Sequence, residues 1–220
     1  MPRRPRFSTG GYVFHALNRA VSRNTIFSTD ADFAAFERVM QQGLREVPMR
    51  VLCYCLMPTH WHMILWPRGD DDLSEYLRWV SVTHTQRWHA AHGTSGTGPL
   101  YQGRFKSFPV ETDQHFYTVS RYVERNALRA NLVARAENWR WSSLWQWKND
   151  HCDVEMHAWP LDRPVDWLEY VNGVETEAEL AALRAAVLRG SPFGSRAWTD
   201  RTATQLGLQS TLRARGRPRK

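Results

Sequence analysis

The amino-acid sequence predicts an α+β fold, in which a ferredoxin-like antiparallel sheet carries helices on one face and a mostly helical extension follows. Three observations predict it. Strand-like and helix-like segments follow one another in the order strand, helix, two strands, helix, strand, helix. Capping residues precede the helical segments. The composition of the sequence changes after Trp139, where tryptophans cluster and a linker-like segment follows. We therefore expect residues 1–150 to form the main domain and residues 151–220 the extension.

The first strand and the first helix have clear signals. Residues 11–19 (GYVFHALNR) mix aromatic and β-branched residues after a pair of glycines, a pattern typical of a strand. Thr29 and Asp32 then have the spacing of a capping box. Apolar residues recur at helical spacing from Phe33 until Pro48, which cannot continue a helix. This segment predicts an amphipathic helix.

Further strands and helices complete the predicted core and extension. Residues 50–56 and 60–66 predict two strands joined around residues 57–59, although one long bent strand is an alternative. The remaining predicted elements are a helix over residues 73–91 after an acidic cluster, a strand over residues 100–110, a helix capped by Thr112 or Asp113, and, in the extension, helices over residues 176–189 and 198–206.

The charge of the chain limits its partners. A formal net charge of +7 indicates a polyanionic partner, either nucleic acid or an anionic membrane surface. No apolar stretch is long enough to cross a bilayer, and the N-terminus lacks the hydrophobic segment of a signal peptide. We therefore expect no membrane residence and a cytoplasmic protein associated with the bacterial nucleoid.

The cysteines agree with a reducing compartment. Cys53, Cys55 and Cys152 form an odd set without the spacing of a zinc knuckle, and we interpret them as reduced, packed thiols. Continuous alternation along the strands would place Cys53 and Cys55 on the face opposite the histidines discussed next.

The stretch LMPTHWHMIL, residues 56–65, holds two histidines one residue apart. Successive side chains of a strand point to opposite faces, so His60 and His62 point the same way while Trp61 and Met63 point the other way. Two neutral imidazoles side by side can hold one divalent metal ion. A strand histidine is also commonly a packed core residue, so this pair alone leaves both interpretations open.

A second part of a site is found in the stretch SRYVERNALRANLV, residues 120–133. Tyr122 and Asn126 are four residues apart and share a helical face, apart from the apolar row of Val119 and Val123. A tyrosine can attack a phosphodiester beside a divalent cation, and an asparagine can offer its amide oxygen as a third ligand. This mixed donor set favours Mg²⁺ or Mn²⁺ over a closed zinc site.

Two alternatives concern the tyrosine itself. Tyr122 could be a half-buried packing residue. Tyr117 is a competing nucleophile, but it lies about 140° around the same helix, so only one of the two can face a metal ion. We predict Tyr122 as the nucleophile, because Asn126 lies four residues after it on the same face. The residue four after Tyr117 is Arg121, which cannot bind a cation.

The whole set of motifs resembles one family. The motifs MPTHWHMILWP, YQGRFKS, RYVERNALRANLV, WRWSS and RGSPFGS, with the final GRPRK, are similar to those of REP-associated tyrosine transposases, relatives of the single-strand transposases of HUH type. The resemblance covers nearly the whole chain and maps the HUH pair on His60 and His62, the catalytic tyrosine on Tyr122, and the third metal ligand on Asn126. Many members have proline after the asparagine, where this chain has Ala127.

The resemblance implies an activity and a partner. It implies a ferredoxin-like core that holds a divalent metal ion, Mg²⁺ or Mn²⁺. It also implies that the protein cleaves and transfers single-stranded DNA through a 5′-phosphotyrosine intermediate. It also implies recognition of short palindromic REP sequences that form hairpins. The partner is therefore expected to be single-stranded and hairpin DNA, and the chain is expected to act as a monomer or a homodimer.

Basic residues supply candidate DNA contacts. Those predicted to hold phosphates are Arg104 and Lys106 on a strand, and Arg121, Arg125 and Arg129 in an i, i+4 row on the tyrosine's helix. A solvated charged face is the alternative for each. In the tail, RGRP has the core of an AT-hook, whose Arg215 and Arg217 would enter the minor groove of A·T-rich DNA. Nonspecific phosphate attraction is the alternative for this tail.

Three other classes of function use parts of the same pattern. A metal-dependent hydrolase would use the histidines without Tyr122 and form no covalent adduct with DNA. A domesticated DNA-binding protein or repressor would keep the basic surface without cleavage or transposition. A zinc-site protein would need more ligands, and His84, His89 and His92 have no helical spacing that brings all three together.

Overall fold

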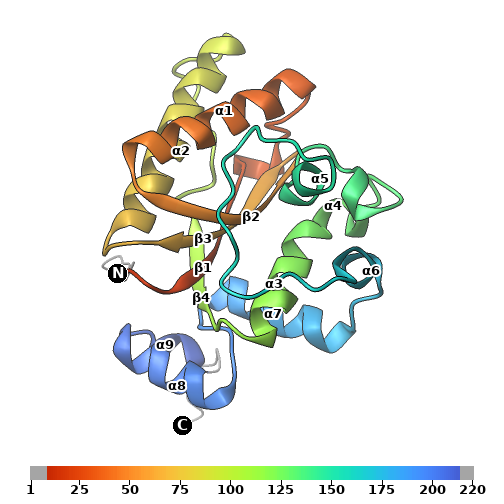
Figure 1. The fold of residues 1–220 in the computed structure, drawn as a ribbon. Coiled ribbons are helices and arrows are strands. Elements are labelled where there is room, and N and C mark those ends of the chain that lie inside the picture. The colour runs from red at the N-terminus through yellow and green to blue at the C-terminus, as the bar shows by residue number, and fades with distance from the viewer. Residues whose placement is uncertain (1–8, 214–220) are drawn as a thin grey trace.

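The computed structural model describes residues 9–213 and has a four-stranded sheet at its centre (Figure 1). The strands are β1 (Val13–Arg19), β2 (Met49–Met57), β3 (His60–Pro67) and β4 (Lys106–Val110). Their order in the sheet is β2-β3-β1-β4, and all neighbouring strands are antiparallel. This is the arrangement of a ferredoxin-like sheet, so the predicted α+β class is confirmed.

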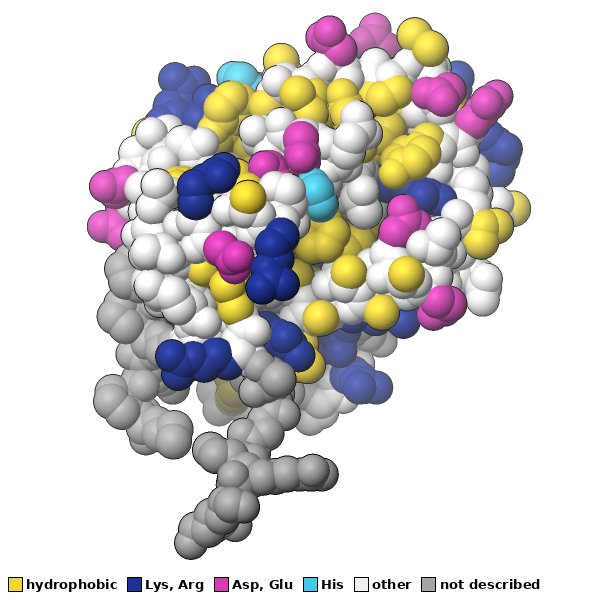
Figure 2. Space-filling view, turned by 90° about the horizontal axis from the view of Figure 1, so that it is seen from below, with side chains coloured by type: hydrophobic (Ala, Val, Ile, Leu, Met, Phe, Trp, Pro, Cys, Tyr) yellow, Lys and Arg dark blue, Asp and Glu magenta, His cyan; other side chains and the backbone are white. Residues whose placement is uncertain are grey.

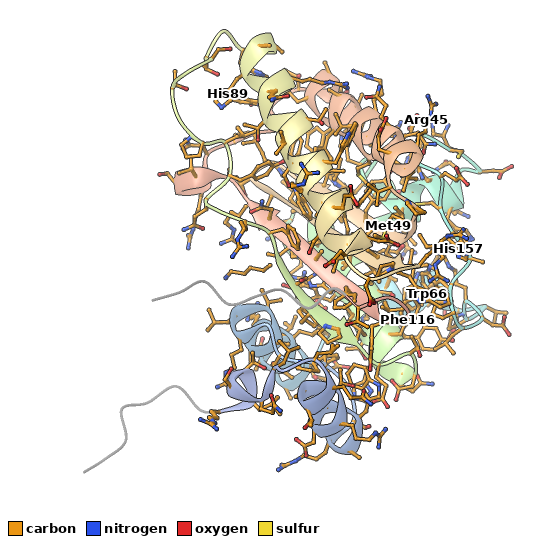
Figure 3. The ribbon with its side chains drawn as sticks, turned by 90° about the vertical axis from the view of Figure 1, so that its left-hand side faces the viewer. Arg45, Met49, Trp66, His89, Phe116 and His157 are labelled. Carbon is orange, nitrogen blue, oxygen red and sulfur yellow. The ribbon has the colours of Figure 1, made fainter. Side chains whose placement is uncertain are left out.

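The helices are divided between the two faces of the sheet. α1 (Asp30–Glu46) and α2 (Asp72–Ala91) lie side by side on one face and enclose an apolar core with the strands (Figure 1, Figure 3). α1 begins at the predicted capping box, in which the Thr29 hydroxyl accepts from the Asp32 N–H. α3 (Gln114–Glu124) packs on the opposite face. The expectation of helices on one face therefore holds for α1 and α2 but not for α3.

Alternation along β3 divides its side chains between these two faces. Trp61 and Met63 lie in the core under α1 and α2, whereas Ile64 lies in the core under α3. His62 shares the face of Ile64 and contacts a tyrosine of α3. The strand thus directs Trp61 and Met63 to one helical layer, and His62 and Ile64 to the other.

The cysteines of β2 lie on the same face as the histidines, which corrects the sequence-based prediction. β2 and β3 form a hairpin in which Cys55 pairs with His62 and Cys53 pairs with Ile64. Directly opposed residues of an antiparallel pair share a face, and the short turn reverses the alternation that continuous counting assumes. Both thiols are buried, and burial raises the pKa of Cys55 to about 12. Cys152, in contrast, is exposed rather than packed.

Segments that follow α3 in the chain cover both edges of the sheet. At the β2 edge, the Leu56 N–H donates to the Trp141 carbonyl at 2.9 Å. At the β4 edge, the Glu111 N–H donates to the Phe193 carbonyl, and the Phe193 N–H donates to the Pro109 carbonyl. These backbone bonds satisfy edge groups that would otherwise pair with another chain.

The described part of the extension is helical, as predicted. The remaining elements are α4 (Asn126–Arg129), α5 (Ser143–Lys148), α6 (Trp167–Asn172), α7 (Glu177–Arg189), α8 (Arg196–Gln205) and α9 (Gln209–Leu212), with short 3-10 helices at Val21–Arg23 and Ala136–Asn138. α7 begins at a capping box on Thr176 and ends at Gly190, whose φ of 68° suits glycine. No helix within residues 9–213 has the length and apolar character needed to span a bilayer.

Candidate active site

His60 and His62 lie together on the face of β3 that α3 covers. Their ring centroids are 5.1 Å apart, and the rings are nearly perpendicular. Burial lowers the pKa of His60 to about 4 and that of His62 well below its ordinary value, and nearby arginines add to both shifts. Both imidazoles are therefore neutral near pH 7, the form in which a ring nitrogen can bind a metal ion.

A third histidine, which the sequence analysis missed, contacts this pair. His15 of β1 is fully buried, and its Nε2 lies 2.9 Å from Nδ1 of His62. The two rings meet through these nitrogens with nearly parallel planes, and their centroids are 5.1 Å apart. Burial lowers the pKa of His15 to about 3, so this ring is also neutral. The signal in the sequence was a histidine in an otherwise apolar strand, on the face that Val13 and Leu17 share.

Tyr122 reaches the histidines from the last turn of α3. Its ring centroid lies 5.7 Å from that of His62 and 6.2 Å from that of His15, and both contacts are edge-on. Tyr117 is turned elsewhere: its hydroxyl donates to the Asp162 carbonyl at 2.6 Å and its ring packs on tryptophans. The structure thus brings Tyr122, and not Tyr117, next to the histidines.

Asn126 follows Tyr122 by one helical turn, although the helix is divided in two. α3 ends before Arg125 and α4 begins at Asn126, but Arg125 keeps helical dihedral angles and the Arg129 N–H still bonds to its carbonyl. Asn126 is only 7% exposed, and its Nδ2 has no hydrogen-bond partner among the described residues. A half-turn of the side-chain amide exchanges its oxygen and nitrogen, so this buried position can present the amide oxygen to a cation.

These donors fit a divalent metal ion. His60 and His62 supply neutral imidazoles, and Asn126 supplies a buried carboxamide whose Nδ2 has no hydrogen-bond partner among the described residues. α4 packs on β2 near the metal ligands, since Ala127 of α4 lies in the same buried cluster as Cys55, the hairpin partner of His62. Imidazole and amide donors with open positions suit Mg²⁺ or Mn²⁺. The residues present are therefore compatible with the predicted cofactor.

A second group of potential metal ligands lies apart, where β4 leads into α3. Ligand atoms of Glu111, Asp113 and His115 lie within 4.8 Å of one another. The carboxylates of this group already accept hydrogen bonds from the backbone. Glu111 accepts from the Ser195 N–H at 2.6 Å, and Asp113 accepts from the His115 N–H. These bonds cap α3 and fasten the start of α8, which accounts for the cluster without a cation.

Arg129 holds the ring of Tyr122. Its guanidinium carbon lies 4.2 Å from the ring centroid, and its Nη2 donates to the Tyr122 carbonyl at 3.0 Å. Its Nη1 donates to both carboxylate oxygens of Glu175, at 2.8 and 3.0 Å. Glu175 precedes α7, so the extension supplies the carboxylate that fixes the arginine on the tyrosine.

Arg121 and Arg125 bind the chain itself, which corrects their predicted role in DNA binding. Arg121 is buried and donates to the Gly173 carbonyl at 2.8 Å. Arg125 donates to the carbonyls of Val171 and Asn172. Carbonyl groups at the end of a helix lack partners within the helix and carry partial negative charge, so guanidinium groups bind them well. The predicted row therefore fastens α6 to α3 and α4.

Basic side chains surround a cavity beside the tyrosine. The cavity, of about 600 Å³, lies between β1, β4, the loop before β4, and α7, and Tyr122 forms part of its wall. Its basic lining residues are Arg19, Arg104, Lys106 and Arg184, and no described residue that lines it is acidic. On the underside of the molecule shown in Figure 2, Lys and Arg side chains outnumber Asp and Glu side chains in the lower half. Arg215 and Arg217 of the tail lie outside the described residues.

Glu175 offers a test of how the extension supports the site. We expect Glu175→Gln to lower the free energy of unfolding by about 2 kcal/mol, because Arg125 and Arg129 lose a nearly buried shared carboxylate. Urea denaturation measures this change. Asp200→Asn removes the exposed i, i+4 pair with Arg196 and should leave stability unchanged. Equal effects of the two substitutions would show that the Glu175 contacts add nothing.

Comparisons with known proteins agree with this fold. The family model described as "Transposase IS200 like" matches residues 8–126. A Haemophilus influenzae protein named as a REP-associated tyrosine transposase is 20% identical over 164 residues, which cover 71% of this chain and 89% of that protein. A solved structure of a REP-associated tyrosine transposase bound to a REP hairpin matches with a TM-score of 0.53 and 18% identity, over 81% of this chain and 96% of that one. The predicted resemblance is thereby confirmed, and the chain belongs to the IS200-like transposase family.

Proposed function

We propose that the protein cleaves single-stranded DNA beside REP-type hairpins and transfers the cut strand through a 5′-phosphotyrosine on Tyr122. The observation that carries this proposal is the contact between Tyr122 and His62, with the buried Asn126 one turn beyond the tyrosine. The proposed metal ligands and the proposed nucleophile are thus close enough to act on one phosphate. The relative bound to a REP hairpin supports the choice of DNA.

The residues of the chain have separate roles in this reaction. His60, His62 and Asn126 would hold the ion, which supplies polarisation of the scissile phosphate and uptake of its developing charge. The Tyr122 oxygen attacks phosphorus, and the 3′-oxygen of the upstream nucleotide leaves, so the phosphate stays on the tyrosine. Arg129 keeps the tyrosine ring in place. Attack by the 3′-hydroxyl of another strand on the phosphotyrosine completes transfer and frees the tyrosine.

A labelled DNA substrate tests the proposal. We expect a denaturation-resistant adduct when the protein is incubated with single-stranded hairpin DNA and Mg²⁺ or Mn²⁺. A label at the 3′ end should stay with the protein, and a label at the 5′ end should be released. Chelator should prevent both results. Hairpin binding without cleavage would instead support a DNA-binding protein or repressor, and cleavage without an adduct would support a hydrolase.

The basic cavity gives a prediction for DNA affinity. Arg104 and Lys106 are exposed at its rim, so we expect the double substitution to Glu to weaken binding of single-stranded DNA by at least tenfold and to lower its salt dependence. Fluorescence anisotropy at several salt concentrations measures both effects. The matched control is Arg38→Glu with Arg45→Glu on the exposed side of α1, on the other face of the sheet. Losses of equal size in both variants would mean that only net charge matters.

A further inference from the structure

The contact between His15 and His62 joins two buried rings without a carboxylate or a carbonyl between them. Nε2 of His15 lies 2.9 Å from Nδ1 of His62, and the two ring planes are nearly parallel, at an interplanar angle of 22°, as an in-plane hydrogen bond between them requires. Two ring nitrogens at this distance share one proton, because two lone pairs would repel and two protons would clash. The position of that proton decides which nitrogen of His62 has a free lone pair.

Each of the two arrangements has a definite consequence for the metal site. When Nδ1 of His62 carries the proton, it donates to His15, and Nε2 of His62 has a lone pair for a cation. When Nε2 of His15 carries the proton, neutral His62 must be protonated at its own Nε2 and cannot bind a metal ion there. Histidine ligands commonly donate their second N–H to a neighbouring acceptor, which fixes the tautomer and the ring orientation.

We propose that His15 is the positioning residue of the metal site: it accepts the Nδ1–H of His62 and so directs the Nε2 lone pair of His62 toward the metal ion. The inference rests on the proposed function for the presence of that ion. His15 is fully buried on β1, and the in-plane contact with His62 and a contact with Phe108 hold its ring. In this arrangement its other nitrogen, Nδ1, carries the ring's own proton and has no hydrogen-bond partner among the described residues, so only the bond to His62 fixes which nitrogen of His15 is protonated.

Two substitutions separate hydrogen bonding from packing. His15→Phe keeps an aromatic ring at this buried position but removes the acceptor. His15→Gln loses the ring but offers an amide oxygen that can accept the Nδ1–H of His62. The matched control is His84→Phe, since His84 is also buried and hydrogen-bonded, to Tyr101, but belongs to α2 and packs against α1 on the other face of the sheet.

The first measurement uses the wild-type protein without metal. Nitrogen-15 NMR of labelled histidines, with His62 assigned by loss of its signals in a His62 variant, reports which ring nitrogen carries the proton. We expect the Nδ1–H form for His62 in the wild type and in His15→Gln, and an increase of the Nε2–H form in His15→Phe. A wild-type His62 protonated at Nε2 overturns the inference.

The second measurement is Mn²⁺ affinity without DNA, by calorimetry or electron paramagnetic resonance. We expect His15→Phe to raise the Kd about 10- to 100-fold, as is usual when such a partner is removed. His15→Gln should restore most of the affinity, and His84→Phe should bind like the wild type. Unchanged affinity in His15→Phe, or equal losses in His15→Phe and His15→Gln, overturns the inference.

Failure of the proposed function gives a different result. A wild-type protein that binds no Mn²⁺ and forms no adduct overturns the proposed function. The tautomer of His62 in the metal-free protein still decides whether His15 sets it. The two conclusions can therefore fail separately.

Discussion

Tyr122→Phe is expected to abolish the covalent adduct with DNA while leaving the fold, the metal affinity and the hairpin affinity close to wild type. The substitution removes one hydroxyl and keeps the ring, so the edge contact with His62 and the contact with the Arg129 guanidinium remain. Without the phenol oxygen no phosphotyrosine can form, and strand transfer is lost with it. Denaturing gels with 3′-labelled hairpin DNA measure the adduct, and anisotropy measures binding.

Tyr117→Phe is the control on the same helix. The hydroxyl of Tyr117 bonds to the Asp162 carbonyl, so its loss should cost about 1 kcal/mol of stability and leave adduct formation intact. An adduct peptide with the modification on Tyr117 would contradict the assignment. It would also argue against Asn126 as a ligand, because Asn126 lies one turn beyond Tyr122 and not beyond Tyr117.

Local patterns were sufficient to predict much of the fold. The capping boxes of α1 and α7 and the helical apolar rows involve residues close in sequence. Such contacts depend only on the local spacing of residue types, so the sequence is enough to predict them. The same reasoning predicted that His60 and His62 share a face and that Tyr122 and Asn126 share another. Spacing of two or four residues fixes such relations directly.

Relations between distant segments could not be predicted in this way. The face of Cys53 and Cys55 depends on where the hairpin turn reverses the alternation, which no count along one strand reveals. His15 meets His62 because β1 pairs with β3, a contact across 47 residues. The sequence shows that His15 lies in an apolar strand. It does not show that His62 is its partner, because that contact depends on the order of strands in the sheet.

The arginine row shows a related limit. Arg121, Arg125 and Arg129 do share a helical face, as predicted, but the face is covered by the segment between α6 and α7. Charge at helical spacing is equally compatible with DNA phosphates, with carbonyls at a helix end, or with a carboxylate. Here these arginines bind carbonyls and a carboxylate about 50 residues further along the chain, and the basic residues that line the cavity remain the proposed phosphate contacts.

His62→Ala is expected to reduce cleavage at least a thousandfold, because a bound ion contributes several kcal/mol to stabilisation of charge in the transition state. Hairpin affinity should remain within a few fold of wild type, since most of it comes from phosphate contacts outside the metal site. Single-turnover cleavage assays measure the first effect, and anisotropy measures the second.

The buried position of His62 makes a stability control necessary. His62 is 3% exposed, so its truncation leaves a cavity and removes the partner of His15. His84→Ala makes a comparable change, since His84 is 2% exposed and bonded to Tyr101. If both variants lose stability alike and only His62→Ala loses cleavage, the loss is chemical. Cleavage by His62→Ala in chelator at the wild-type rate would mean that Tyr122 acts without a metal ion held by these histidines, and the roles of His60 and Asn126 would fail with it.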